Sequence, residues 1–212
     1  MAAIDAALPA DDGVAYFNRL YRKTTEEVQQ AVVGTAFEVG DFLSRLDVVF
    51  ANLYFEAVAQ SVHGDKIAPA WAPLFECRDL PDVHPIQFAL AGMNAHINHD
   101  LPIAVVTTCR ELTLQPVDDS PAHRDFVRVN GVLRETEAVV KAWFERGLLA
   151  KLDREMGKTD DALAMWSIAT ARDLAWQSAQ VLWALDDHPH IQEAYLRTLR
   201  TLVRLGGNGI LI

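Results

Sequence analysis

Cysteine is scarce in this 212-residue sequence, which contains only Cys77 and Cys109. Because the two residues are far apart and form no CxxC pair, they provide neither a metal knuckle nor a disulfide framework. We therefore interpret both as reduced core residues. Several catalytic motifs are absent as well, including G-x-S-x-G, a P-loop, a glycine-rich dinucleotide loop and H-E-x-x-H. Serine nucleophiles and Walker-type nucleotide hydrolysis thus lack their usual motifs.

Long apolar runs are also absent, since residues such as Asp47, Asn94 and Arg172 interrupt each stretch before it reaches the length of a membrane span. The first residues, MAAIDAALPADDG, lack the basic region and apolar core of a signal peptide. We therefore expect a soluble, cytoplasmic protein with no membrane partner. The formal charge of -10 and the pI near 5.1 disfavour nucleic acid as a partner. The oligomeric state stays open.

Hydrophobic residues are abundant, at 50% of the chain, and they recur at spacings of three and four. Alternating runs bounded by turn residues are rare. This pattern is typical of amphipathic helices and not of strands. No internal repeat, low-complexity segment or long linker divides the chain. The sequence predicts an all-α fold: one domain over residues 1–212, built as a bundle of about six to eight helices with a kinked central helix.

Capping residues and glycines predict where the helices begin and end. In the first half of the chain we expect a helix capped by Asp11 and Asp12, a short helix from Thr24 to Gly34, a long helix from about Asp41 to Gly64 and a short helical turn at WAPLFE. A central helix then begins at His84-Pro85. The remaining expected helices are a segment from Ser120-Pro121 to about Gly157, a helix capped by Thr159 and a last helix from Pro189 to Gly206-Gly207. The apolar tail NGILI is expected to fold back onto the bundle.

The central helix, QFALAGMNAHINHDLPIAVVTTCREL, is apolar on nearly all sides, so we expect it to be buried. Pro102 lacks an amide hydrogen and its ring clashes with the preceding turn, which predicts a kink there. Such a kink would bend the helix just past its polar residues. Freed backbone groups at this kind of position commonly belong to a site.

Four polar side chains lie in the segment GMNAHINHDLP of this apolar helix. His96 and Asp100 are four residues apart and share one face, while Asn94 and Asn98 form a second pair on an adjacent stripe. An imidazole beside a carboxylate acts as a general acid or base. His and Asp one turn apart also bind divalent metals when another helix supplies a third ligand. The third interpretation is a polar network that only fixes helix packing.

Two further charged residues occupy apolar surroundings. Asp47 lies between Leu43 and Phe50, where we expect it to be buried, with a perturbed pKa or a partner. It is a candidate to orient His96 or to act as a third metal ligand; an ion pair with Arg172 or Arg45 is the alternative. Tryptophans flank Arg172, which is expected to stack on an indole and either to bind an anionic or carbonyl group or to serve structure alone.

The chain resembles DUF5995, an actinobacterial family of unknown function. The resemblance rests on YFNRLYRKTTEEV, FLSRLDVVFANLYFEAV, PIQFALAGMNAHINHDLPIAVV, DFVRVN and AMWSIATARDLAW, and so covers nearly the full length. It implies an all-helical fold and little about a reaction. It also implies polar residues at His96, Asn98 and Asp100 and variation at His99, which favours His96 and Asp100 over a His99-Asp100 metal dyad.

We expect a small-molecule enzyme, for example of secondary metabolism, that performs acid-base chemistry in a pocket between helices. The candidate catalytic residues are His96, Asp100, Asp47 and Arg172; the candidate substrate-binding residues are Asn94, Asn98, Tyr54 and Trp176. No cofactor is certain from the sequence. A metal-dependent hydrolase, with zinc, manganese or iron on His96 and Asp100, is one alternative, and a non-catalytic binding or scaffold protein is the other. We expect Asp125 to face solvent or to serve an N-terminal turn.

Overall fold

The computed structural model describes residues 1–32, 37–133 and 167–212 of the chain. Within these ranges every regular element is a helix and no strand occurs, so the predicted all-α fold is confirmed. In the same ranges no helix is long and apolar enough to cross a membrane.

The chain begins with α1 (Ala2–Ala7) and α2 (Gly13–Val32). Asp12 caps α2 as predicted, because its Oδ1 accepts a hydrogen bond from the Val14 amide at 2.8 Å. The predicted break at Thr24 is wrong, since α2 continues through this residue without interruption. A capping box needs the free amides of a helix start, and inside a continuous helix those amides are already bonded.

Two helices follow, α3 (Gly40–His63) and α4 (Ala72–Cys77). Both agree with the predicted long helix and the predicted WAPLFE turn. Helix α3 ends where expected because Gly64 adopts φ 75°, a left-handed conformation that glycine permits without steric cost. The connector between the two helices brings Trp71 into the core, where its side chain is fully buried.

The predicted central helix is confirmed, and it consists of three consecutive segments: α5 (Pro85–Ala95), η1 (His96–Asp100) and α6 (Leu101–Glu111). Helices α2 and α10 pack on α5, while α3 and α9 pack on α6. The predicted kink at Pro102 is not confirmed. What changes near Pro102 is the backbone hydrogen-bond pattern, which switches from α-helical to π-helical in η1 and returns to α-helical in α6.

A helix over residues 121–133 comes next and begins as predicted, since the Ser120 hydroxyl accepts a hydrogen bond from the His123 amide at 3.1 Å. Its expected continuation to Gly157 and the expected cap at Thr159 lie outside the described residues. Helix α9 (Ile168–Ala184) begins after Ser167, which has an extended backbone and caps it. The helix predicted from Thr159 was expected to include Ser167, and this part of the prediction is wrong because Ser167 is not helical.

The last helix, α10 (Pro189–Ile210), starts at the predicted proline but does not stop at Gly206-Gly207. The tail does not reverse direction, because the helix continues almost to the end of the chain. It does pack on the bundle as expected, since Leu211 is buried and the Gln87 side chain of α5 donates to the Ile210 carbonyl at 2.7 Å. A Cβ atom on Gly207 would lie 3.0 Å from the Pro73 Cγ atom, closer than most such contacts. Glycine here serves the close approach of α10 to α4 and does not end the helix.

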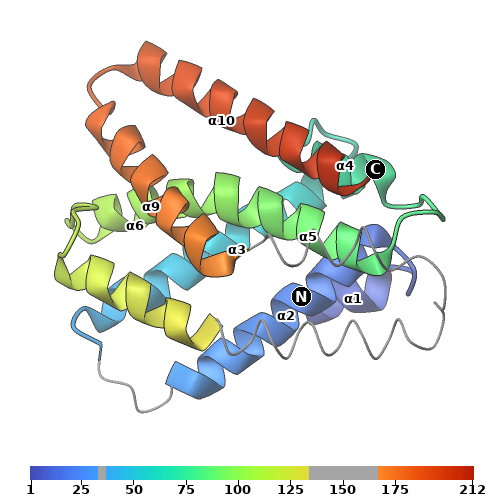
Figure 1. Ribbon diagram of the computed structural model, residues 1–212, viewed down its shortest axis with the longest axis horizontal. Helices are drawn as coiled ribbons and strands as arrows, with labels where there is room; N and C mark the ends of the chain where they lie inside the picture. The colour runs from blue at the N-terminus through green and yellow to red at the C-terminus, as the bar shows by residue number, and fades with distance from the viewer. Residues whose placement is uncertain (33–36, 134–166) are drawn as a thin grey trace.

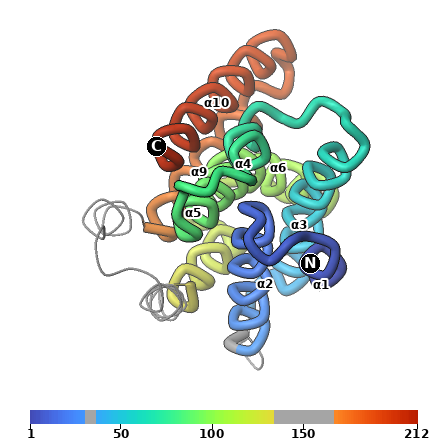
Figure 2. Tube along the Cα trace, turned by 90° about the vertical axis from the view of Figure 1, so that its right-hand side faces the viewer, coloured from blue at the N-terminus to red at the C-terminus, as the bar shows by residue number. Residues whose placement is uncertain are grey.

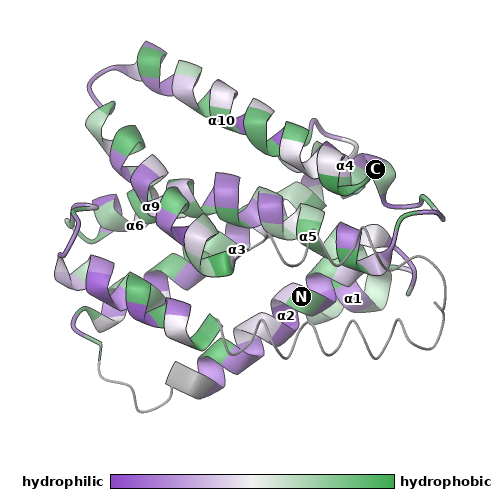
Figure 3. Ribbon diagram, viewed as in Figure 1, coloured by the Kyte–Doolittle hydropathy of each residue, from purple (hydrophilic) through white to green (hydrophobic). Residues whose placement is uncertain are grey.

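The helices are arranged around the central one. In Figure 1, α10 lies at the top, the α5–η1–α6 helix in the middle and α2 at the bottom, and the same vertical order appears in the perpendicular view of Figure 2. Helices α2 and α10 alternate between hydrophilic and hydrophobic residues along their length in Figure 3, as expected for helices with one face toward solvent. The polar residues of η1 thus lie in the interior.

Candidate functional site

The π-helical turn η1 brings three side chains of the central helix together. The Leu101 amide donates to the carbonyl of His96, five residues earlier, which is the hydrogen-bond pattern of a π-helix. The Pro102 ring cannot fit against a regular preceding turn and has no amide to donate, so a wider turn relieves the clash. Such turns are rare, and they occur frequently at functional sites.

Asp100 is the acceptor at the centre of this cluster and is only 2% exposed. Its Oδ2 lies 3.1 Å from His96 Nδ1, and its Oδ1 lies 2.7 Å from His99 Nδ1. The Trp71 indole also donates to Oδ2, at 3.0 Å. Burial alone would raise the pKa of Asp100, but the hydrogen bonds from the two histidines outweigh it and hold the pKa below its usual value. Asp100 is therefore a carboxylate held by three donors.

His96 is the member of the cluster that reaches a cavity. Burial lowers its pKa, against the opposing effect of Asp100, so the imidazole is neutral at pH 7. Because ionised Asp100 can only accept hydrogen bonds, the proton lies on Nδ1 and Nε2 carries a lone pair. Nε2 is buried and has no hydrogen-bond partner among the described residues. The Phe50 ring stacks on the imidazole with 3.6 Å between ring centroids. The Tyr21 ring forms a T-shaped contact with the imidazole, with 4.6 Å between centroids.

The cavity beside His96 has a volume of about 490 Å³ and is bounded by α2, α3, the central helix, the helix over residues 121–133 and α9. Most of its lining is apolar or aromatic. The sequence predicted that Asp47, His96, Asp100 and Arg172 would share a pocket between their helices. Asp100 does not line this cavity, but Asp47, His96 and Arg172 do. Tyr21 lines it as well.

Asp47 corrects one expectation, because it is exposed and not buried. Its side chain opens onto the cavity, where protein atoms surround it on many sides and reduce its hydration. This desolvation raises the pKa of Asp47, and the more distant charge of Arg172 partly offsets the rise. Within the described residues Asp47 forms no hydrogen bond or ion pair, and Arg45, one of its expected partners, pairs instead with Glu111.

Arg172, on α9, also lines the cavity and is only 8% exposed. Its Nε donates to the Asn130 side-chain oxygen at 2.6 Å, and its Nη2 donates to the Phe126 carbonyl at 3.1 Å. The expected stacking on an indole is wrong, because the guanidinium lies 4.0 Å above the Phe126 ring. Burial lowers the pKa of Arg172 to about 10, so the group stays charged at pH 7.

The four residues expected to bind substrate do not line this cavity. Asn94 donates to the Val203 carbonyl of α10 at 2.8 Å, and Asn98 donates to the Asn94 side-chain oxygen at 3.0 Å. The Tyr54 hydroxyl is bonded to Asn18 and its ring packs behind His96. Trp176 packs against Phe42, His123 and Phe126. These residues support the surrounding helices, because their polar groups or rings are engaged by protein neighbours.

Sequence reasoning missed three residues of the site. Trp71 anchors Asp100 from a connector whose path no pattern in the sequence predicts. Phe50 and Tyr21 both contact His96, but nothing in the sequence distinguishes either of them from an ordinary core residue. The Tyr21 hydroxyl has no hydrogen-bond partner among the described residues; burial, followed by the charge of Asp47, raises the pKa of Tyr21 strongly. The one available signal was the apolar stripe that Tyr21 shares with Phe17 on α2.

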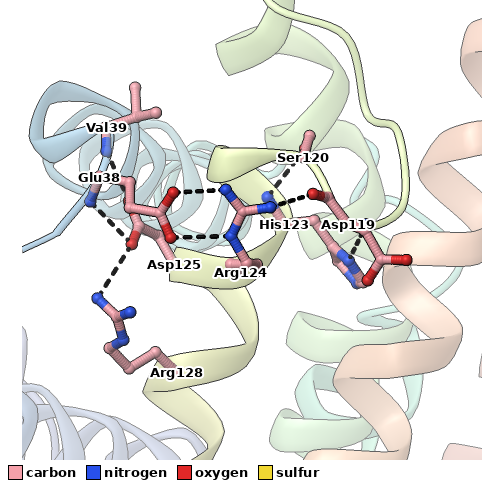
Figure 4. A network of polar contacts seen from close by, with 8 residues as sticks. All are labelled: Glu38, Val39, Asp119, Ser120, His123, Arg124, Asp125 and Arg128. Atoms are coloured by element: carbon pink, nitrogen blue, oxygen red, sulfur yellow. Dashed lines mark hydrogen bonds and ion pairs between the residues drawn. The ribbon is translucent and has the colours of Figure 1, made fainter.

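Asp125 also differs from expectation. It is fully buried, and its two oxygens accept the amides of Glu38 and Val39 at 3.1 and 2.7 Å, as Figure 4 shows. These amides precede α3, whose own N-cap residue offers no side-chain cap. Arg124, next to Asp125, pairs with Glu38. Asp125 thereby fixes the start of the helix that carries Asp47 and Phe50, and has no role at its own N-terminal turn.

The cluster does not fit the metal site considered from sequence. Both Asp100 oxygens already accept hydrogen bonds, so the carboxylate and His96 are engaged with each other and with Trp71. In the part of the chain that the structure describes, no group of three or more His, Cys, Asp or Glu side chains is placed to hold a metal ion.

Comparison with known proteins gives one match. A family model described as a family of unknown function, DUF5995, matches residues 1–212, the full length of the chain. No curated protein and no solved structure matches.

Proposed function

Because this chain belongs to DUF5995, a family of unknown function, we propose its function from the cavity: it binds a small, mostly apolar organic molecule there and uses His96 as a general base. The protein would act on this molecule in the cytoplasm, as an enzyme of small-molecule metabolism.

The cavity supports the binding part of the proposal. Its volume of about 490 Å³ lies within the range of small-molecule sites, roughly 300–1,000 Å³. Such sites are mostly apolar, with a few polar groups that fix the orientation of the ligand. Here Tyr21, Asp47, His96 and Arg172 are polar groups of this kind, on a wall that also contains Phe17 and Phe50.

One observation carries the catalytic part. His96 has an unpartnered Nε2 lone pair, while its Nδ1 is held by Asp100 at 3.1 Å. A base needs a neutral nitrogen toward the substrate and an orienting partner on the other nitrogen. Asp100 is in turn held by Trp71 and His99, so the imidazole has a fixed orientation. Proton abstraction from a bound ligand is the chemistry that this arrangement supports best.

A reaction that needs only a base tests the proposal. In 5-nitrobenzisoxazole a base removes the proton on C3, the electrons of that bond form a nitrile, and the N–O bond breaks to give a coloured cyanonitrophenolate. The flat probe suits an aromatic wall. We expect saturable ring opening by the wild-type protein, reduced by about 100-fold or more in His96→Gln.

Asn98→Ala is the matched control, because Asn98 lies in the same π-helical turn and is hydrogen-bonded but does not line the cavity. It is expected to retain the wild-type rate. Equal rates for the wild type and His96→Gln would contradict the catalytic role of His96.

A non-catalytic binding protein is the second candidate. It is favoured by the burial of Nε2, which has no contact with solvent, and by the full engagement of Asp100. In that case the probe would bind in the cavity without reacting, and His96→Gln would lower the free energy of unfolding and leave probe binding unchanged.

A further inference from the structure

Arg172 is a buried cation whose direct partners are all neutral. Its guanidinium contacts an amide oxygen of Asn130, a carbonyl oxygen and a phenyl ring of Phe126, and it forms no ion pair with the residues that the structure describes. Burying a charge without a counter-ion is unfavourable, and neutral partners offset this cost only in part. Of its five N–H groups, the described residues occupy two.

The acidic residues nearest to Arg172 do not neutralise it. Asp173 interacts electrostatically with Arg172 from the exposed side of α9. The Asn130 side-chain nitrogen donates to the Asp173 carboxylate at 3.3 Å, while the Asn130 side-chain oxygen accepts from Arg172. Asp47 interacts with Arg172 only at long range, from another part of the cavity wall. The positive charge thus lies on an otherwise mostly apolar surface.

We propose that the ligand of this cavity carries a carboxylate, which binds the free N–H groups of Arg172 while its apolar body lies against the aromatic wall. This inference rests on the proposed function and names its substrate class. A carboxylate matches the planar guanidinium with two parallel hydrogen bonds, and its single charge equals that of Arg172. A phosphate would bring nearly two charges to a lining in which Arg172 is the one cationic side chain among the described residues, and Asp47 would repel the second charge.

Arg172 and His96 then have separate tasks. Arg172 holds the acid group, and His96 faces another part of the same molecule, because both residues line the same space. Asp47 opposes the anion, since it is the one carboxylate among the described residues of the lining. The two charged residues should therefore affect binding of an acid in opposite directions.

Binding of three probes with one aromatic body and different charge tests this assignment. The probes are 2-naphthoate, its uncharged counterpart 2-naphthamide, and the cation of 2-naphthylmethylamine, each titrated against the whole chain by calorimetry. We expect 2-naphthoate to bind at least about tenfold more tightly than either of the others. Arg172→Gln should remove this preference without weakening the amide, and Asp47→Asn should tighten naphthoate several-fold.

Each other result overturns a distinct statement. Equal affinity for naphthoate and naphthamide in the wild type, or a preference that survives Arg172→Gln, overturns the carboxylate assignment and leaves the binding proposal intact. If Arg172→Gln does not fold, Asp47→Asn decides, because unchanged or weaker naphthoate binding in that variant overturns the assignment. If none of the three probes binds, the cavity takes no such molecule and the proposed function fails as well.

Discussion

Two polar pairs of the central helix look equivalent in sequence and differ in structure. Asn94 with Asn98 and His96 with Asp100 are both spaced by four residues and both hydrogen-bonded within the helix. The asparagine pair is completed by the backbone of α10, on the side away from the cavity. In the histidine pair, His96 lines the cavity and its buried Nε2 has no hydrogen-bond partner among the described residues. Burial of a polar group therefore does not by itself mark a candidate site, whereas an unused lone pair on a residue that lines a cavity does.

Removing the acceptor of the histidine cluster should have the largest effect on stability. Asp100→Ala leaves three buried donors, on Trp71, His96 and His99, without an acceptor. We expect the free energy of unfolding to fall by about 3–5 kcal/mol. Urea denaturation followed by circular dichroism measures this change. A loss below about 1 kcal/mol would mean that the cluster does not hold the turn together.

The asparagine pair should matter less. Asn94→Ala removes one hydrogen bond to the Val203 carbonyl and one from Asn98, whose side chain is only partly buried. We expect a cost of about 1 kcal/mol in the same urea experiment, with no change in probe binding. If Asn94→Ala cost as much as Asp100→Ala, or altered the affinity for naphthamide, the two pairs would not have the separate roles assigned to them.

The two pairs also differ in their response to pH. Burial lowers the pKa of His96 below its ordinary value of 6.5, and the histidine hydrogen bonds lower that of Asp100 below 3.8. A group with a lower pKa in the folded state binds fewer protons there, so acid favours unfolding. The stability contributed by His96 is complete above about pH 6.5 and is lost as the pH falls through the lowered pKa.

We therefore expect the free energy of unfolding to decrease below pH 6.5, by at most about 1.4 kcal/mol per pH unit for this one proton. His96→Gln should flatten the decrease, and Asn94→Ala should leave it unchanged because amides do not titrate. Urea denaturation at pH 7.5, 6.5 and 5.5 provides the comparison. A slope that is identical in the wild type and His96→Gln would assign the acid sensitivity to other groups.

The sequence predicts most of the helical fold but only part of the site. Apolar spacing and capping residues locate α3, α4 and the central helix, because these signals are local. Gly207 is a position of close approach to Pro73 inside α10 and not a helix end, and the anchoring of Asp100 depends on Trp71 from a distant connector. Both are long-range contacts that no local pattern encodes.

The same limit explains which site residues were anticipated. Asp47, His96 and Arg172 stand out because each is polar within an apolar helix, and the structure places them around one cavity. Asn94 and Asn98 stand out for the same reason, yet their partners are on α10. Sequence identifies the buried polar residue, but only the fold determines whether protein or ligand completes its hydrogen bonds.

The protonation state of His96 Nε2 is the most direct measurement of the central claim. Long-range ¹H–¹⁵N correlation spectra of ¹⁵N-histidine protein, assigned with His96→Gln, report each imidazole nitrogen separately. At pH 7 we expect the nitrogen shift of an unprotonated Nε2 and a protonated Nδ1, and a change at Nε2 when 2-naphthoate saturates the protein. A protonated Nε2, or a resonance that does not respond to the bound probe, would contradict the role of His96 as a base in this cavity.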